Sequence, residues 1–448
     1  VQEHFLTSGL NSPFMPDEGI WGNMKQQQVE VMKGTNMLIK RGSYPQSTSR
    51  VLDSGSRAVW IGQDHNFMFH YQDIRILLRR AITWTIGYNL YKTWENDIIM
   101  ILDDPGNAQN AWLEHWHYPT LSEEVIEQYL IKPLQEHNAV LNINFVAGFV
   151  NDKTQMVEPA WTQQFVDEFG TKQDYVSSKR GYDKGVKSGV FEVLCHGLTH
   201  MQPDLSSEPG WYGASLYKER AEVGWYREFG DTRRHKEIPA AEQLWRMKTA
   251  RNWLIHQFDV TPLQFCQGGN GSSATYENNT YRLAGEAGFG WYGWGDGYLG
   301  QDMVVVGWDF KGTPNSPLFV GSLPNGHDFG ITKAPEEFAT IFEKYPKARF
   351  FGINEYVGYM HASNSGQLVT GKKPQLILVV DYDPHYCWHF VEQPSSWILE
   401  LSDWVIDELG ETPLVKVDGK AISLLKTSYM IPIPAGIGKH HIEISKMK

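Results

Sequence analysis

The sequence predicts an α/β fold: a distorted (β/α) barrel of seven or eight strands, with an N-terminal α/β segment before it and a small β-sandwich after it. Two observations lead to this prediction. From residue 98 onward, strand-like apolar runs alternate with helical patterns, which is typical of parallel βα units. After residue 374, short strand-like runs separated by turns follow one another, which is typical of a β-sandwich.

The first domain is predicted to comprise residues 1–95 and to pack on the barrel. Strands are expected at 29–32, 36–40 and 57–62. A helix is expected at 72–90, where apolar side chains recur at near-helical spacing. We interpret this segment as structural.

Residues 96–363 are predicted to form the barrel. The candidate strands are 98–103, 139–145, 189–195, 263–267, 288–292, 303–309, 317–323 and 348–353, and the most regular helices are 121–137, 240–258 and 334–345. The first strand is apolar through its centre, as expected of a strand covered on both faces. In such a barrel, the loops at the carboxyl ends of the strands surround a concave mouth.

The end of the chain is predicted to form a separate domain. Residues 363–374, rich in Ser, Gly and Lys, are expected to be a linker. Residues 375–448 contain strand-like runs at 376–380, 397–401, 414–417 and 441–444. A small β-sandwich with a structural role is therefore expected there.

Composition narrows the choice of partners. The chain has 448 residues, 41% of them hydrophobic, and a net charge of −12, which argues against nucleic acid or an anionic membrane surface as partner. No apolar run approaches the roughly 20 residues of a membrane span. The three cysteines, Cys195, Cys266 and Cys387, lie too far apart for a metal-ligand spacing, and a disulfide framework is not expected.

Two predicted strand ends carry side chains suited to metal binding. Asp103 and Asp104 end the strand at 98–103, and their mutual repulsion requires a cation or a proton nearby. His196 and His200 follow the strand at 189–195, and a helical turn there would bring both rings within reach of one ion. Carboxylate and imidazole together suit zinc or a similar divalent ion. Taken singly, the aspartates also fit an Asp-Pro-Gly turn and the histidines a solvated or core pair.

With these two motifs the sequence resembles the polysaccharide deacetylases, the carbohydrate esterases that share homology with chitooligosaccharide deacetylase. In that family a strand ends in Asp-Asp and a later strand leads into His-x-x-x-His. The resemblance spans roughly residues 98–363. It implies that Asp103 is the catalytic base and that Asp104, His196 and His200 hold the metal.

Two later motifs depart from the family pattern. The family's Arg-Pro-Pro-like stretch, whose Arg faces the catalytic Asp, corresponds to residues 262–271, where Gln267 stands at the Arg position. A neutral amide can hydrogen-bond a carboxylate but does not lower its pKa as a cation would. Glycines beside Asn270 allow close approach of the backbone to a ligand. The family's Leu-x-His motif corresponds to residues 322–328, which makes His327 the expected general acid.

Aromatic residues near the expected mouth are candidate sugar contacts, because Trp and Tyr stack on the apolar faces of sugar rings. The long insertion at 201–239 includes Trp211 and is interpreted either as a substrate-binding wall or lid, or as a packed surface loop. Trp291, Trp294 and Asp296 suggest a sugar-binding platform. Gln267 and Asn270 complete the expected substrate contacts.

The sequence thus predicts a metal-dependent hydrolase that removes acetyl groups from an N- or O-acetylated polysaccharide or oligosaccharide, with zinc as the first expected ion. A polymeric substrate implies a secreted or periplasmic protein, and because the sequence begins at Val1 without a Met, any signal peptide is expected to have been removed from it. Two alternatives stay open. A glycoside hydrolase on a related barrel would use two carboxylates from among Asp296, Asp309 and Glu355. A catalytically inactive glycan-binding protein would account for Gln267 in place of the family's Arg.

Overall fold

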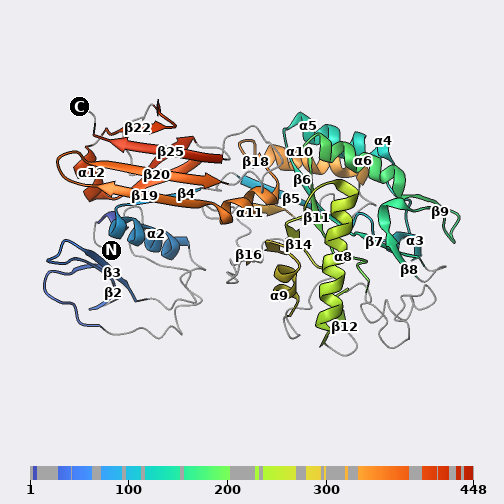
Figure 1. The fold of residues 1–448 in the computed structure, drawn as a ribbon, viewed down its shortest axis with the longest axis horizontal. Coiled ribbons are helices and arrows are strands. Elements are labelled where there is room, and N and C mark those ends of the chain that lie inside the picture. The colour runs from blue at the N-terminus through green and yellow to red at the C-terminus, as the bar shows by residue number, and fades with distance from the viewer. Residues whose placement is uncertain are drawn as a thin grey trace. The chain divides into compact units, whose positions relative to one another are not determined.

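The computed structural model describes residues 4–7, 29–41, 43–62, 72–92, 97–112, 117–151, 156–201, 228–231, 236–268, 279–293, 297–298, 318–320, 331–382, 396–410, 412–422, 430–434 and 438–446. The chain divides into two compact units (Figure 1). One unit comprises Val1–Thr93, Ala362–Asp383 and Pro394–Lys448, and the other comprises Trp94–His361 and Pro384–Gln393. The N-terminal segment therefore shares a unit with the C-terminal residues, and its predicted packing on the barrel stays a prediction.

The second unit is built on an eight-stranded sheet. Its order is β16-β15-β14-β11-β6-β5-β17, and β18 also pairs with β5. Every pair is parallel except β15 with β16. The strands are β5 (Asp97–Asp103), β6 (Leu141–Phe145), β11 (Phe191–Cys195), β14 (Gln264–Phe265), β15 (Trp291–Tyr292), β16 (Gly297–Tyr298), β17 (Leu318–Val320) and β18 (Arg349–Phe350). The predicted α/β architecture is present, and among the described residues the sheet is an open path rather than a closed barrel.

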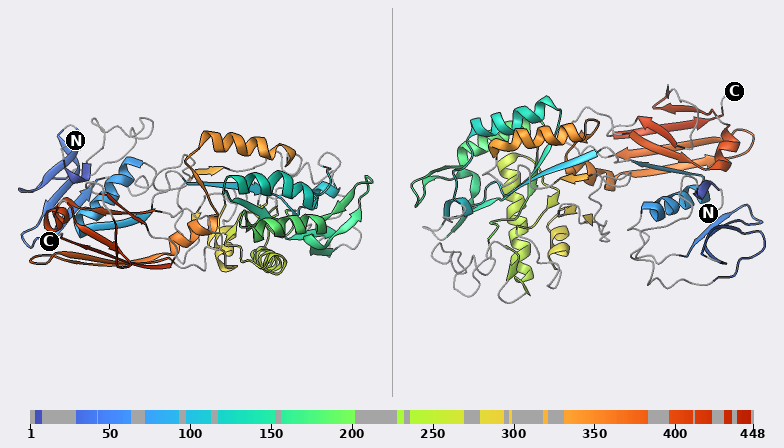
Figure 2. Two further views of the ribbon diagram at one scale, coloured as in Figure 1. Left: turned by 90° about the horizontal axis from the view of Figure 1, so that it is seen from above. Right: turned by 180° about the vertical axis from the view of Figure 1, so that it is seen from behind.

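Helices cover this sheet, with α10 beside α5 and η4, and α6 beside α4 (Figures 1 and 2). The helices are α3 (Gln109–Trp112), α4 (Glu123–Ile126), η4 (Glu127–Ile131), α5 (Lys132–Glu136), η5 (Ala160–Thr162), α6 (Tyr175–Lys187), α8 (Ala240–Phe258), α9 (Asn279–Glu286), α10 (Ala334–Lys344) and α11 (Ile353–His361). Three two-stranded ribbons pair β7 (Gly148–Asn151) with β8 (Met156–Pro159), β9 (Gln164–Val166) with β10 (Lys172–Asp174), and β12 (Gly230–Asp231) with β13 (Lys236–Glu237).

The apolar run of β5 forms a strand because both of its faces are covered. Ile98, Met100 and Leu102 point into a core cluster shared with the covering helices. Ile99 and Ile101 point into a second cluster, which includes side chains from the start of α11. Burying each of these side chains stabilises the fold by roughly 1.5–3 kcal/mol relative to leaving it in water. The strand is thereby fixed in the centre of the sheet, and its last residue is presented at the carboxyl edge.

The first unit contains three sheets. One is antiparallel and joins β1 (Asn36–Arg41), β2 (Tyr44–Val51) and β3 (Arg57–Ile61). The second has the order β19-β20-β25-β22-β23. Its strands are β19 (Ser363–Val369), β20 (Gln375–Tyr382), β25 (Gly438–Ser445), β22 (Leu414–Val417) and β23 (Lys420–Ile422). The third joins β24 (Met430–Pro434), β21 (Ser396–Leu401) and β4 (Tyr88–Lys92), in that order. The unit also holds η1 (Phe5–Thr7), α2 (Gln72–Ile86) and α12 (Asp403–Leu409). A strand from the N-terminal segment thus completes a sheet of the predicted sandwich region.

Three local predictions are wrong. Residues 29–32 form no strand. The helix predicted at 72–90 ends at Ile86, because Gly87 takes a φ of 103° and the chain continues as β4. The predicted linker begins instead with β19, which pairs with β20 along its whole length. The strand predicted at 303–309 lies outside the described residues.

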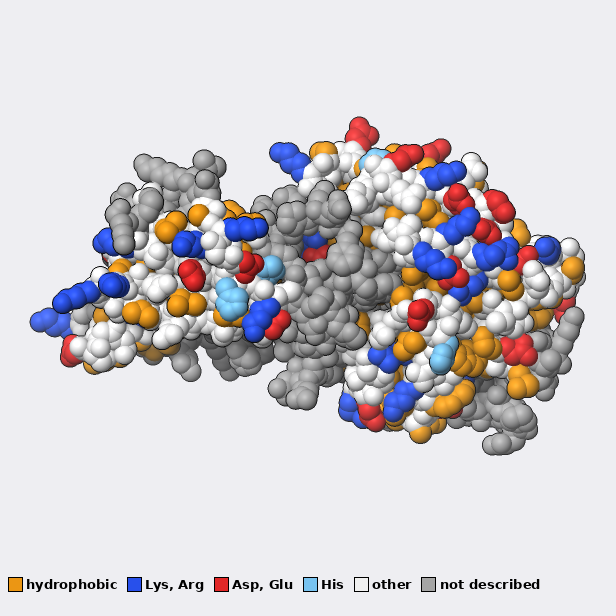
Figure 3. Space-filling view, turned by 45° about the horizontal axis from the view of Figure 1, so that its top comes forward, with side chains coloured by type: hydrophobic (Ala, Val, Ile, Leu, Met, Phe, Trp, Pro, Cys, Tyr) orange, Lys and Arg blue, Asp and Glu red, His pale blue; other side chains and the backbone are white. Residues whose placement is uncertain are grey.

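Charged side chains of both signs are intermingled on the face that Figure 3 shows. Ion pairs join α6 to α4 and η4, among them Arg180 Nε with Glu123 Oε2 at 2.7 Å and Lys184 Nζ with Glu127 Oε2 at 2.8 Å. Among the described helices, none combines the length and apolar character needed to cross a membrane.

Candidate metal centre

The first half of the site is the sharp turn at the carboxyl end of β5. Asp103 is the last residue of the strand, and Asp104 takes a positive φ of 78°, a conformation that Asp tolerates better than most residues. The next residues are Pro105 and Gly106, and a Cβ on Gly106 would lie 2.4 Å from the carbonyl oxygen of Val146. Glycine is therefore required there, and the turn packs directly against the end of β6.

The second half is the loop that follows β11. The backbone N–H of His196 donates to the carbonyl of Phe145 (2.9 Å), which extends the ladder between β11 and β6 by one bond. The helical turn predicted after His196 is absent, since residues 196–197 are irregular and residues 198–201 form bends. Gly197 and His200 instead have positive φ values of 106° and 56°. The two histidine rings thus converge through a strained loop and not through helical spacing.

The structure brings Asp104, His196 and His200 together. The Nε2 atoms of the two histidines each lie 3.1 Å from Oδ1 of Asp104, and the ring centroids are 4.9 Å apart. One potential ligand atom from each residue lies within 4.8 Å of the others. All three residues are at least 90% buried. Two imidazole nitrogens and one carboxylate oxygen form a donor set that suits zinc and leaves a position open for water or substrate.

A hydrogen bond from Nδ1 of His196, on the side of the ring away from Asp104, determines which ring nitrogen carries the proton. Nδ1 of His196 lies 2.8 Å from the carbonyl oxygen of Cys266, and because a carbonyl only accepts, Nδ1 carries the proton. In the neutral ring, Nε2 then presents a lone pair to the Asp104 oxygen. Two acceptors at 3.1 Å repel each other unless a proton or a metal cation lies between them. The geometry of this pair therefore fits a bound metal ion.

The electrostatics of the site favour positive charge. Burial lowers the pKa of His196, but Asp103, Asp104 and the Cys266 carbonyl outweigh it and raise the pKa well above 6.5. The same negative field attracts a divalent cation, which competes with the proton for Nε2.

Asp103 lies next to this cluster and is oriented by a neighbour that the sequence analysis missed. Nδ2 of Asn144, the residue paired with Asp103 across β5 and β6, donates to Oδ1 of Asp103 at 2.7 Å. A signal was present in the sequence, because Asn142 and Asn144 stand at alternate positions of an otherwise apolar run, 141–145. Buried amides on one face of a central strand require polar partners.

The remaining predicted site residues are only partly described. Gln267 follows β14, and its Oε1 accepts a hydrogen bond of 2.7 Å from the hydroxyl of Tyr292. Trp291 lies on β15. The other candidates lie outside the described residues: Trp211, Asn270, Trp294, Asp296 and His327.

Glu355, one of the carboxylates of the glycosidase alternative, lies far from Asp103. Both of its oxygens contact Arg349 Nη1, at 2.8 and 2.7 Å, and Arg349 Nη2 lies 3.0 Å from Asp97 at the start of β5. Asp97 and Asp103 are the first and last residues of β5, which places them about 20 Å apart at the usual strand rise. The carboxylates of a glycosidase stand within about 10 Å of each other, so Glu355 and Asp103 do not form such a pair, and the pairs expected among Asp296, Asp309 and Glu355 stay a prediction. Asp296 and Asp309 lie outside the described residues.

Cys195 is not a nucleophile. It is fully buried at the end of β11, and burial raises the pKa of its thiol to about 12. The thiolate needed for nucleophilic attack is therefore not formed at neutral pH.

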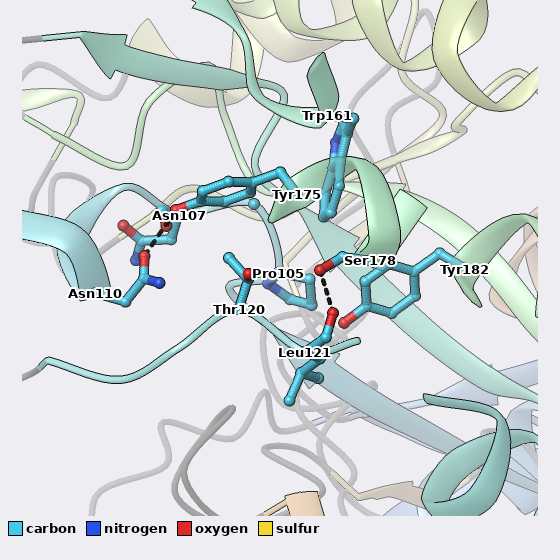
Figure 4. Close-up of a pocket in the computed structure, with 10 residues that line it drawn as sticks. Pro105, Asn107, Asn110, Thr120, Leu121, Trp161, Tyr175, Ser178 and Tyr182 are labelled. Atoms are coloured by element: carbon cyan, nitrogen blue, oxygen red, sulfur yellow. Dashed lines mark hydrogen bonds between the residues drawn. The ribbon is translucent and has the colours of Figure 1, made fainter. Parts of the chain in front are cut away.

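A small pocket lies behind the turn (Figure 4). It is lined by Pro105, Gly106, Asn107, Asn110, Thr120, Leu121, Trp161, Tyr175, Ser178 and Tyr182, which include none of the three converging ligands. The Tyr175 hydroxyl lies 3.0 Å from the Asn107 carbonyl and 2.8 Å from Oδ1 of Asn110. The residues around this pocket thus support the turn, and Tyr175 connects the turn to α6.

No protein-family model and no curated protein sequence matches this chain. Solved structures of carbohydrate esterase family 4, the group of deacetylases that the sequence resembles, do align with it. A pseudoenzyme of that family from Bacillus anthracis is 10% identical, over 59% of this chain and 66% of its own, with a TM-score of 0.31. The family 4 domain of a multidomain xylanase from the hindgut metagenome of Trinervitermes trinervoides is 9% identical over 60% of this chain and 93% of its own (TM-score 0.30). A family 4 carbohydrate esterase from Streptomyces lividans, solved with acetate, is 9% identical over 56% and 88% (TM-score 0.26). At such low similarity, the function has to be argued from the site itself.

Proposed function

We propose that this protein is a metal-dependent hydrolase that removes acetyl groups from an N- or O-acetylated polysaccharide or oligosaccharide. One observation carries the proposal: two imidazole nitrogens face the same oxygen of Asp104 at 3.1 Å, beside a second carboxylate, Asp103. This arrangement combines a donor set for a divalent ion with an adjacent base. The choice of an acetylated glycan as substrate follows the resemblance of the Asp-Asp and His-x-x-x-His motifs.

In the proposed reaction, Asp104, His196 and His200 hold the ion, for which zinc is the first expectation. When bound, a divalent ion acidifies water and polarises the carbonyl group of a substrate. Asp103 takes the proton of the attacking water. The hydrogen bond from Asn144 fixes the Asp103 carboxylate in position. The amine or alcohol that leaves requires a proton in turn, and we assign this role to His327.

The surrounding residues are proposed to bind the glycan. Trp211, Trp291 and Trp294 would stack on sugar rings, while Gln267, Asn270 and Asp296 would bind hydroxyl or acetamido groups. We also propose that residues 96–363 close into a barrel around the site, that residues 1–95 and 375–448 flank it in the chain, and that the protein is secreted or periplasmic, where polymeric glycans are found.

The proposal is tested by metal analysis of the purified protein together with acetate release from a panel of acetylated glycans, with and without chelator. We expect about one metal ion per chain and acetate release that chelator abolishes and added zinc restores. Acetate release that is insensitive to chelator would contradict the metal-dependent reaction. Shortened sugars without acetate would favour the glycoside hydrolase.

The environment of Gln267 favours a second candidate, a glycan-binding protein without activity. Where the family has an Arg facing the base, this chain has an amide whose oxygen is engaged by Tyr292. Asp103 then receives a neutral hydrogen bond from Asn144 and no positive charge from that position. Saturable binding of an acetylated glycan to the metal-loaded protein with no acetate release would support this candidate.

A further inference from the structure

A fully buried carboxylate lies underneath the loop that carries the two histidines. Glu228 accepts hydrogen bonds from three consecutive backbone N–H groups: Leu198 at 3.1 Å, Thr199 at 3.2 Å and His200 at 2.9 Å. Three successive N–H groups directed at one anion form a nest, a backbone arrangement that binds negative charge. Here the protein's own side chain occupies the nest.

Arg246 of α8 supplies the opposite charge. Its Nη1 lies 3.1 Å from Oε1 of Glu228 and 3.3 Å from Oγ1 of Thr199, and its own side chain is only 3% exposed. The guanidinium thus contacts both the carboxylate and the loop that the carboxylate holds. An ion pair this deeply buried is costly to desolvate, and four donor contacts on Glu228 offset part of that cost; burial still raises the pKa of Glu228 to about 8.

The loop is tightly packed at two glycines. A Cβ on Gly197 would lie 2.2 Å from Oε2 of Glu228, and a Cβ on Gly268 would lie 2.6 Å from Cδ2 of His200. The backbone N–H of Glu228 donates to the Gly268 carbonyl at 3.3 Å. Both glycines therefore let the carboxylate and the His200 ring pack against the backbone. The positive φ of His200, an uncommon conformation for a residue other than glycine, is held by these contacts.

We propose that Glu228 is a positioning residue of the metal centre, whose carboxylate in the backbone nest, paired with Arg246, holds His200 in ligating geometry opposite His196 before the ion arrives. This inference rests on the proposed metal site but not on the identity of the substrate. Glu228 touches the loop backbone and neither imidazole in the contacts described above, so its effect on the ion is exerted through the loop. A loop ordered in advance loses less conformational freedom on binding, and the ion binds more tightly.

The test compares Glu228→Gln with the wild type by competition of zinc with a chromophoric chelator. The amide places an NH2 group against N–H donors, so the nest is no longer satisfied and the loop relaxes. We expect zinc affinity to fall about tenfold to a hundredfold, the range seen when outer-shell partners of metal ligands are changed. The absorption spectrum of the cobalt-substituted variant should also change, because the two histidines no longer present the same geometry.

Glu192→Gln is the matched control. Glu192 is another fully buried carboxylate of the same unit, and it accepts from a backbone N–H, that of Asn354, at 2.6 Å. Glu192→Gln should keep the affinity for zinc and the increase in Tm that saturating zinc produces. A general loss of stability would lower the Tm of the chelated protein in either variant without changing the affinity.

Thr199→Val provides a milder variant should Glu228→Gln fail to fold. It removes the hydroxyl that Arg246 and the Met201 backbone contact while leaving the three backbone donors in place, and a loss of about threefold in zinc affinity is expected. Unchanged zinc affinity in Glu228→Gln, or in Thr199→Val if only that variant folds, would overturn the inference. Wild-type protein that binds zinc but releases no acetate would defeat the proposed function and leave this inference standing.

Discussion

Both ends of β5 carry buried carboxylates, but the partners that the structure describes for them differ. At the amino end, Asp97 meets Arg349 at 3.0 Å. At the carboxyl end, Asp104 meets the imidazoles of His196 and His200, each at 3.1 Å. A guanidinium is a permanent cation, whereas an imidazole loses its proton and then ligates metal. Carboxylates of one strand are therefore structural where they face an arginine and, in our proposal, functional where they face histidines.

Removing a ligand at the carboxyl end should have the largest effect. Asp104→Ala and His196→Ala each leave two of the three donors, so we expect metal content near zero and at least a thousandfold loss of acetate release. Metal is measured by elemental analysis after dialysis. Full metal content in both variants would contradict the assignment of the ligands.

Asp103→Asn separates the base from the ligands. The amide keeps the shape of the side chain but accepts no proton, so turnover should fall by about 100-fold or more while the metal stays bound. Loss of the metal from this variant would show that Asp103 is itself a ligand.

At the amino end, Arg349→Met should lower the free energy of unfolding without changing the zinc affinity. It leaves the carboxylates of Asp97 and Glu355 buried without their guanidinium, a change that costs about 3–5 kcal/mol in typical proteins. Urea denaturation measures the loss, and zinc affinity per folded chain should be unchanged. A loss of zinc affinity with normal stability would mean that the two ends of β5 do not have separate roles.

A smaller effect is expected from Asn144→Ala, which removes the hydrogen bond to Asp103. We expect kcat to fall about tenfold with metal content unchanged, because the base loses its orientation. Asn142→Ala is the control: this amide lies two residues earlier on β6 and donates to the carbonyls of Met100 and Phe351, each at 3.0 Å. It should lower stability but not kcat. Equal effects of the two variants on kcat would argue against a specific role for Asn144.

The most gradual effect concerns pH. Burial raises the pKa of Glu192 from 4.5 to about 8, so the folded state keeps a proton that the unfolded state loses. The free energy of unfolding should therefore fall as pH rises from about 4.5 to about 8, by at most about 1.4 kcal/mol per pH unit from this group. Glu192→Gln should flatten this dependence, as measured by urea denaturation across the range. An unchanged slope would show that Glu192 is ionised in the folded protein.

Much of the site could be predicted because its candidate ligands and base follow directly on the ends of predicted strands. The runs before Asp103 and His196 are apolar and central, and parallel strands bring their carboxyl ends to one edge. The conformation of the histidine loop could not be predicted in the same way. His-x-x-x-His fits a helix, and the bent loop is fixed by contacts from residues distant in sequence, Glu228 and Gly268 among them.

The course of the chain at its two ends was harder to predict for a similar reason. Residues 363–369 look like a linker because their side chains are small and polar, yet they form β19 through backbone hydrogen bonds to β20. Likewise, β4 follows directly on α2 and becomes a strand by pairing with β21, some 300 residues later. Local propensity was decisive in neither case, since the partner strand supplies the stabilisation.

The most direct test of the central claim is calorimetric titration of zinc into chelator-stripped wild-type protein near neutral pH, in two buffers of different ionisation enthalpy. We predict saturable binding of one ion per chain with release of protons, because the raised pKa of His196 leaves it protonated in the metal-free protein. The apparent affinity should rise with pH. No saturable binding, or binding that persists in Asp104→Ala, would contradict the claim that the carboxyl end of β5 is a metal centre.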